Sequence, residues 1–178
     1  MRYIAFLRAI NVGGHTVKMD RLRALFESFG FLEVETFIAS GNVIFSTPEK
    51  DAALLEGQIA AGLQRALGFE VATFIRTDAE LAQIAAYQPF DRSAVEAATA
   101  FNVAFVSGPL DEKARQKLVS LTTDIDSFAT HGREVYWLCR RRQSESAFSN
   151  AVLEKTLGIK STLRGVNTVQ KMAAKFAS

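Results

Sequence analysis

Residues 65–70 read Arg-Ala-Leu-Gly-Phe-Glu, and residues 155–160, ninety positions later, read Lys-Thr-Leu-Gly-Ile-Lys. In both segments a run with helical spacing ends at a glycine, the residue favoured just past a helix C-terminus. A second pair lies upstream of each segment, because Gly41 and Gly132 each separate two strand-like runs, at an offset of 91. The two near-equal offsets predict that the chain holds two copies of one structural unit.

Each predicted unit has the order strand, helix, strand, strand, helix, strand, and then one more helix. In the first unit, short apolar runs bounded by turn residues predict strands at residues 3–8, 34–39, 43–46 and 71–76. Apolar residues at helical spacing, with a Thr77–Glu80 capping box, predict helices at residues 22–29, 51–67 and 77–86.

In the second unit the same patterns predict strands at residues 101–106, 128–130, 135–139 and 161–163. Helices are expected at residues 111–121, 150–157 and 168–176. This order is that of the split βαβ, or ferredoxin-like, arrangement. The sequence therefore predicts an α+β protein made of two tandem ferredoxin-like units, each followed by an extra helix.

The boundary between the units is predicted at residues 89–98, which contain Pro89 and several polar residues between two regular stretches. This segment is interpreted as a linker. The first ferredoxin-like unit is accordingly expected at residues 1–90 and the second at residues 99–178.

The composition is that of a globular protein with a core. The 178 residues are 48% hydrophobic and 22% charged, which excludes a disordered chain. The apolar run at the N-terminus is too short for a signal peptide, and no segment is apolar enough to span a membrane. A cytoplasmic protein that does not insert into membranes is therefore expected.

Cysteine and histidine are scarce, which limits the chemistry. Cys139 is the single cysteine, so an internal disulfide is excluded, and its apolar neighbours favour a buried thiol over a reactive one. The two histidines, His15 and His131, lie far apart without cysteine partners. A zinc site is not expected, and neither is any cofactor.

Polar and glycine residues gather where the first unit's strands end. In the split βαβ topology the first and second strands are parallel, so the segments that follow them lie at one end of the sheet. The glycines allow close backbone approach, and the next helix directs its N-terminal amides to that end. We interpret this end as a candidate site for an anionic group, formed by Arg8, Asn11, Gly13, Gly14, Ser40, Gly41 and Asn42.

A second cluster lies before and within the last predicted helix. Asn167 or Thr168 is predicted to cap that helix, a role that needs no ligand. Arg164 and Lys171 flank the cap, and their cationic side chains suit a phosphate group. These four residues complete the set of candidate ligand-binding residues.

Four functions stay open at this point, one of them a protein-interaction or self-assembly module. The leading hypothesis is a binding module for a small anionic or nucleotide-like ligand. The second is nucleic-acid binding, since residues 91–178 carry thirteen Lys and Arg against nine acids. The third is an enzyme that uses acid–base chemistry, although the sequence contains no recognisable catalytic constellation and identifies no catalytic residue.

Two motifs resemble a known family. Residues 3–14, Tyr-Ile-Ala-Phe-Leu-Arg-Ala-Ile-Asn-Val-Gly-Gly, and residues 37–45, Phe-Ile-Ala-Ser-Gly-Asn-Val-Ile-Phe, are similar to a bacterial family of domains of unknown function, number 1697. The likeness extends to residues 132–136 and 167–171. It implies a cytoplasmic protein with two ferredoxin-like halves, and it brings no established activity or ligand.

The chain departs from the family pattern in three places. Ala9 stands where glycine is usual, Gly165-Val166 replaces a frequent Asn-Trp, and Ala147 takes the place of a common lysine. The second half has therefore lost a cation and an aromatic residue, whereas the polar loops of the first half are complete. We expect any ligand site at the first unit's loop end.

Overall fold

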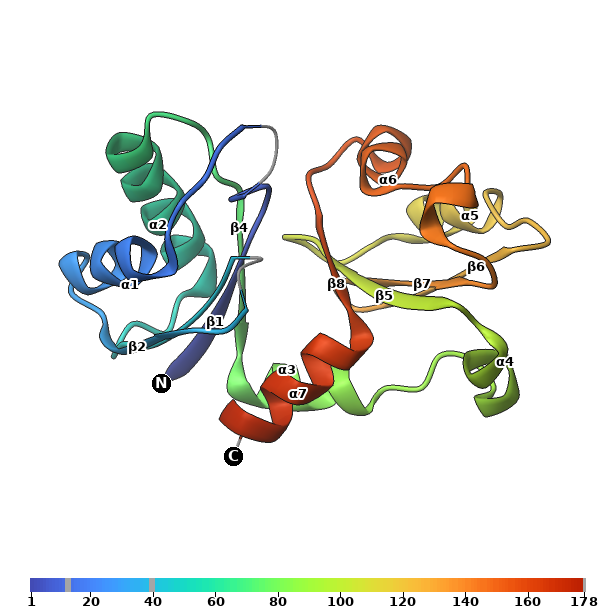
Figure 1. Cartoon of the computed structure of the whole chain (residues 1–178), viewed down its shortest axis with the longest axis horizontal. Helices are drawn as coiled ribbons and strands as arrows, with labels where there is room; N and C mark the ends of the chain where they lie inside the picture. Colours follow the sequence, from blue (N-terminus) through green and yellow to red (C-terminus); the bar gives the residue numbers. More distant parts are fainter. Residues whose placement is uncertain (12–13, 39–40, 178) are drawn as a thin grey trace. The chain divides into compact units, whose positions relative to one another are not determined.

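The computed structural model describes residues 1–11, 14–38 and 41–177 (Figure 1). The chain divides into two compact units: Met1–Ile84 together with Lys171–Ser178, and Ala85–Gln170. Each unit contains one four-stranded antiparallel sheet with helices, so the α+β class is confirmed. The exact boundaries at residues 90 and 99 stay a prediction.

The first unit has the predicted order of elements. They are β1 (Arg2–Leu7), α1 (Met19–Ser28), β2 (Leu32–Thr36), β3 (Asn42–Ser46), α2 (Ala52–Leu67), β4 (Thr73–Thr77) and α3 (Asp78–Ala86). The sheet has the strand order β2-β3-β1-β4, and β3 is antiparallel to both β1 and β2. The first two strands are therefore parallel to each other and end at the same side of the sheet.

The period-two pattern of β1 gives the first unit its core. Tyr3, Ala5 and Leu7 are buried and face the helices, where they pack with residues of α1 and α2 such as Phe26 and Ile59. Figure 1 shows both helices on one face of this sheet. The helices are positioned by burial of this apolar face, since neither has enough intrinsic stability alone.

The predicted helix ends of the first unit are confirmed. Gly30 and Gly68 have φ of +92° and +81°, the left-handed conformation that favours glycine after a helix. The capping box is reciprocal: the Glu80 amide donates to Thr77 Oγ1 at 3.1 Å, and the Thr77 amide donates to Glu80 Oε2 at 2.8 Å. Local sequence alone determines these three features.

The second unit repeats the arrangement. Its elements are α4 (Arg92–Ala97), β5 (Ala100–Phe105), α5 (Glu112–Val119), β6 (Asp126–His131), β7 (Glu134–Cys139), a 3-10 turn (Gln143–Glu145), α6 (Asn150–Leu157), β8 (Thr162–Gly165) and the start of α7 (Val166–Phe176). The residues of α7 from Lys171 on belong to the first unit. The strand order β6-β7-β5-β8 corresponds to that of the first sheet. The segment interpreted as a linker thus contains a short helix, α4.

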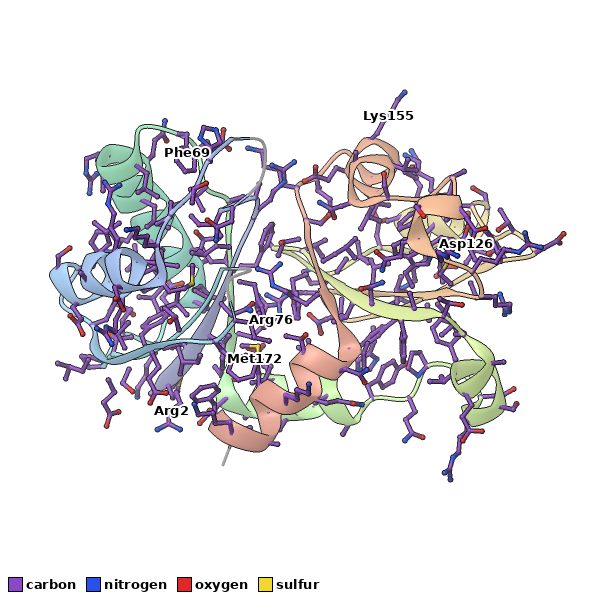
Figure 2. The ribbon with its side chains drawn as sticks, viewed as in Figure 1. Arg2, Phe69, Arg76, Asp126, Lys155 and Met172 are labelled. Atoms are coloured by element: carbon purple, nitrogen blue, oxygen red, sulfur yellow. The ribbon has the colours of Figure 1, made fainter. Side chains whose placement is uncertain are left out.

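The core of the second unit is organised around a buried carboxylate at the start of β6. Asp126 accepts hydrogen bonds from Trp137 Nε1 at 2.8 Å, from Ser146 Oγ at 2.7 Å and from Thr123 Oγ1 at 3.2 Å (Figure 2 labels Asp126). Asp126 is 1% exposed and Trp137 2%. The carboxylate therefore joins β6, β7 and the loop before α6.

Strand register corrects one detail of the comparison between the units. In the first unit Leu7 N donates to Gly41 O, whereas in the second Val106 N donates to Arg133 O. The structural counterpart of Gly41 is therefore Arg133, and not Gly132. The equivalent positions are therefore 92 residues apart and not 91. Gly132 comes one residue earlier, as the first of the two turn residues between His131 and Glu134, which pair with each other.

Register also reveals a pair of buried arginines. Arg76 of β4 pairs with Ile4 of β1, and Arg164 of β8 pairs with Val103 of β5. Each Nη1 donates to the carbonyl of the preceding residue, at 2.9 Å for Arg76 and 2.8 Å for Arg164. The two units thus have a buried arginine at the equivalent position of the last strand, Arg76 in β4 and Arg164 in β8. The sequence motifs compared above did not reveal this similarity.

None of the helices in residues 1–11, 14–38 and 41–177 has the length and apolar character needed to cross a membrane.

Candidate functional site

The two polar segments of the first unit meet at one end of its sheet. Leu7 N, at the end of β1, donates to Gly41 O at 2.8 Å, and Arg8 N donates to Ala72 O at 2.9 Å. The β1 end therefore lies between the β2–β3 connection and the segment that leads into β4. This is the convergence expected from the parallel orientation of β1 and β2.

Gly41 is required at this junction for two reasons. Its φ is +84°, and a Cβ atom built on it would lie 2.6 Å from Ile10 Cγ2 and 3.3 Å from the Leu7 carbonyl oxygen. Gly14, in the facing loop, has φ +85° but open space around it. A positive φ favours glycine at both positions, and at position 41 the close approach of Ile10 and Leu7 also excludes a side chain.

The two asparagines hold the loops in place. Asn11 Oδ1 accepts from Val17 N at 2.8 Å, which ties the β1 end to the segment before α1. Asn42 is buried, and its Nδ2 donates to the Phe37 carbonyl at 2.8 Å while Phe37 N donates back to Asn42 O. Both amides thus make structural hydrogen bonds, and Asn42 fixes the β2–β3 connection.

The start of α1 follows Val17, whose amide donates to Asn11. Lys18 is its N-cap residue, and the Lys18 side chain makes no cap hydrogen bond. The first amides of a helix have no intrahelical acceptor and carry a partial positive charge. Lys18 itself is exposed, and sequence reasoning did not include it among the candidates. Gly13 and Ser40 lie outside the described residues.

The C-terminal candidates occupy different positions from those predicted. Helix α7 begins at Val166, directly after β8, so the prediction that Asn167 or Thr168 caps it is wrong. Both residues lie in its first turn because the strand continues into the helix without a loop. Arg164 belongs to β8, and Lys171 lies in the middle of α7.

Arg164 is buried rather than displayed at a surface. Its Nη1 donates to Thr162 Oγ1 at 2.7 Å as well as to a backbone carbonyl. Burial lowers the pKa of its guanidinium to about 10. Arg164, Asn167 and Thr168 belong to the second unit, whereas Lys171 falls with the first.

Asn102 of β5 has a buried amide that lies opposite a glycine of β8. Its Nδ2 is buried and has no hydrogen-bond partner among the described residues, and in the β5–β8 register it lies opposite Gly165. Residues paired across antiparallel strands project to the same face. A Cβ on Gly165 would meet nothing closer than Thr168 Oγ1 at 3.9 Å, so this position has room for a side chain.

We expect Gly165→Ala to raise the free energy of unfolding by about 0.5 kcal/mol, because it restricts the unfolded chain without strain. Gly165→Asn is expected to add about 1 kcal/mol more by giving Asn102 an acceptor. Urea unfolding of both variants measures the difference. An asparagine variant no more stable than the alanine variant would contradict the pairing.

Cys139 is an inert thiol. It is fully buried, its Sγ donates to the Arg141 carbonyl at 2.9 Å, and burial raises the pKa of the thiol above its usual value. The thiolate is the reactive form, so both burial and protonation oppose its chemistry. The expectation of a structural rather than a reactive cysteine thus has a physical basis.

A thiol reagent such as 5,5′-dithiobis(2-nitrobenzoate) is expected to leave Cys139 unmodified at pH 8 in the folded protein. In denaturant it should label one thiol per chain. Rapid labelling of one thiol per chain without denaturant would contradict this expectation, because it would show that Cys139 of β7 is accessible to solvent.

Among the described residues no group of three or more His, Cys, Asp or Glu is arranged to hold a metal ion.

The fold and its loop geometry define an α+β protein with two similar four-stranded units and a polar loop end on the first. The model of the family described as "Protein of unknown function (DUF1697)" matches residues 1–136, and the chain belongs to this family. The resemblance drawn from residues 3–14 and 37–45 is therefore confirmed. The family description assigns no activity.

A solved structure shows the same fold over the whole chain. A conserved bacterial protein from Streptococcus pneumoniae is similar over 99% of this chain and 98% of that chain, with a TM-score of 0.80 at 19% sequence identity. At this identity the likeness establishes the fold alone. A search of curated proteins found no significant match.

Proposed function

We propose that this protein is a binding module for a small anionic or nucleotide-like ligand at the loop end of the first unit. We further propose that its two units are ferredoxin-like copies that arose by duplication. The matching strand orders and the shared buried arginines, Arg76 and Arg164, support the second statement. The nucleic-acid and acid–base alternatives stay predictions.

The observation that carries the binding proposal is the start of α1, where Lys18 makes no cap hydrogen bond and the preceding Val17 is tied to Asn11. Asn11 thereby ties the β1 end to the residue before Lys18. Arg8 follows β1 at the same end and is half-buried. A guanidinium, an ammonium group and helix amides together suit an anion.

Asn11 and Asn42 have a supporting role in this proposal. Their amides are used in backbone hydrogen bonds, so they shape the site and do not serve as its main ligands. Replacing Asn42 by alanine would therefore disturb the turn as well as any site. A better test changes the cation of the site, Arg8, and follows the fold of the variant by circular dichroism.

The test is thermal unfolding of the protein with inorganic phosphate, pyrophosphate and adenosine monophosphate. A ligand at a hundred times its Kd should stabilise the folded state by about 2.7 kcal/mol, which raises the melting temperature by about 5 °C or more. Arg8→Gln should remove most of this rise. The matched control is Arg23→Gln, because Arg23 is an exposed arginine of α1 in the same unit.

The absence of any stabilisation by the three anions would refute the proposal. So would equal stabilisation of the Arg8→Gln and wild-type proteins.

A further inference from the structure

A cavity of about 410 Å³ lies within the second unit, outside the loop end described above. It is formed by residues 85–95, the start of β5 and the first turns of α7. Its size falls in the range of small-molecule sites. Much of its wall comes from the segment that sequence analysis interpreted as a linker.

Three half-buried aromatic side chains form the apolar walls: Tyr87, Phe90 and Phe101. Their positions are fixed by other rings. Phe90 meets Phe101 edge-on at 5.7 Å between centroids, and Tyr87 packs on Tyr136 at 5.2 Å and stacks on His131 at 4.3 Å. Rings held in this way give a flat ligand a preformed surface for stacking.

The polar part of the wall comes from two helices. Asn167 and Gln170 lie one turn apart on α7, both are exposed, and each amide offers a donor and an acceptor. Ala85 and Ala86, the last residues of α3, line the same cavity. The last carbonyls of a helix have no intrahelical donor and carry a partial negative charge, so they favour a ligand N–H group.

Charge distinguishes this cavity from an anion site. Its one charged lining residue is Arg92, whose Nε donates to Glu96 at 3.0 Å in an exposed ion pair. The carbonyl end of α3 also opposes an anion. The cavity thus combines flat aromatic walls, an amide pair and carbonyl acceptors, without a free cation among its described lining residues.

We infer that this cavity binds an amino-substituted heteroaromatic ring of the nucleobase kind. The ring stacks against Tyr87 and Phe101, its edge pairs with the amides of Asn167 and Gln170, and its amino group faces the carbonyl end of α3. This site is independent of the proposed anion site, because the ligand needs no phosphate.

The inference is tested by isothermal titration of the full chain with adenosine, and with inosine, in which a carbonyl replaces the amino group. Adenosine should bind with a Kd in the micromolar to low-millimolar range, and inosine at least tenfold more weakly. Phe101→Leu and Gln170→Ala should each weaken adenosine binding at least fivefold. The matched control is Gln116→Ala, which removes an exposed glutamine from α5.

Several results would overturn the inference: no saturable adenosine binding, equal affinity for inosine, or unchanged affinity in Phe101→Leu and Gln170→Ala. Binding of oligoadenylate without binding of adenosine would also overturn it, in favour of a nucleic-acid surface. Circular dichroism melting of each variant shows that it is folded. Because adenosine lacks phosphate, a failure here does not decide the anion proposal, which thermal unfolding with phosphate and pyrophosphate tests.

Discussion

Replacing Gly41 by alanine is expected to lower the free energy of unfolding by about 3 kcal/mol, as measured by urea denaturation. The left-handed φ of +84° accounts for about 1 kcal/mol of this, because a Cβ is disfavoured there. The remainder comes from the clash of that Cβ with Ile10 Cγ2 at 2.6 Å and with the Leu7 backbone. The β1 end would have to move away from the β2–β3 connection.

Gly14→Ala is the matched control for this prediction. Its φ of +85° is nearly that of Gly41, but a Cβ there meets nothing within 4 Å. We expect Gly14→Ala to lower the free energy of unfolding by about 1 kcal/mol, the cost of the left-handed φ alone. If the two variants lose the same stability, then close packing against Ile10 is not what requires Gly41.

Replacing Asp126 by alanine is expected to cost about 3 to 4 kcal/mol and to lower the melting temperature by about 10 °C. The change leaves the buried indole N–H of Trp137 and the Ser146 hydroxyl without their acceptor. Each unsatisfied buried donor costs about 1 to 3 kcal/mol. Near-ultraviolet circular dichroism should register the altered surroundings of Trp137, the single tryptophan.

Two further variants make this prediction specific. Asp124→Ala removes an exposed carboxylate two residues away and should change stability by less than about 0.5 kcal/mol. Asp126→Asn retains an acceptor for Trp137 and should cost about 1 kcal/mol. A loss from Asp126→Ala as small as that from Asp124→Ala would show that the carboxylate does not join the strands.

The features predicted well are those that depend on neighbouring residues in the chain. The glycines after α1 and α2, the Thr77–Glu80 box and the order of strands and helices follow from local conformational preference and apolar periodicity. The convergence of the β1 end and the β2–β3 connection followed from topology, once the order was known.

The features that were missed depend on residues far apart in sequence. Two of the partners of Asp126, Trp137 and Ser146, are 11 and 20 positions away, and no spacing rule connects them to it. The cavity in the second unit takes its walls from Tyr87, Phe101 and Asn167, which three separate segments bring together. The start of α7 was misplaced because β8 enters it without the turn that usually marks a helix boundary.

The first compact unit includes residues 171–178, which come from the far end of the chain. Arg2 Nη1 donates to the Phe176 carbonyl at 3.0 Å, Phe37 meets the Phe176 ring edge-on, and Lys175 lies 3.7 Å from Glu35 (Figure 2 labels Arg2). During synthesis the ribosome therefore makes most of this unit first and its last segment only after the whole second unit. The N-terminal unit can complete its packing only after residue 176 has emerged from the ribosome.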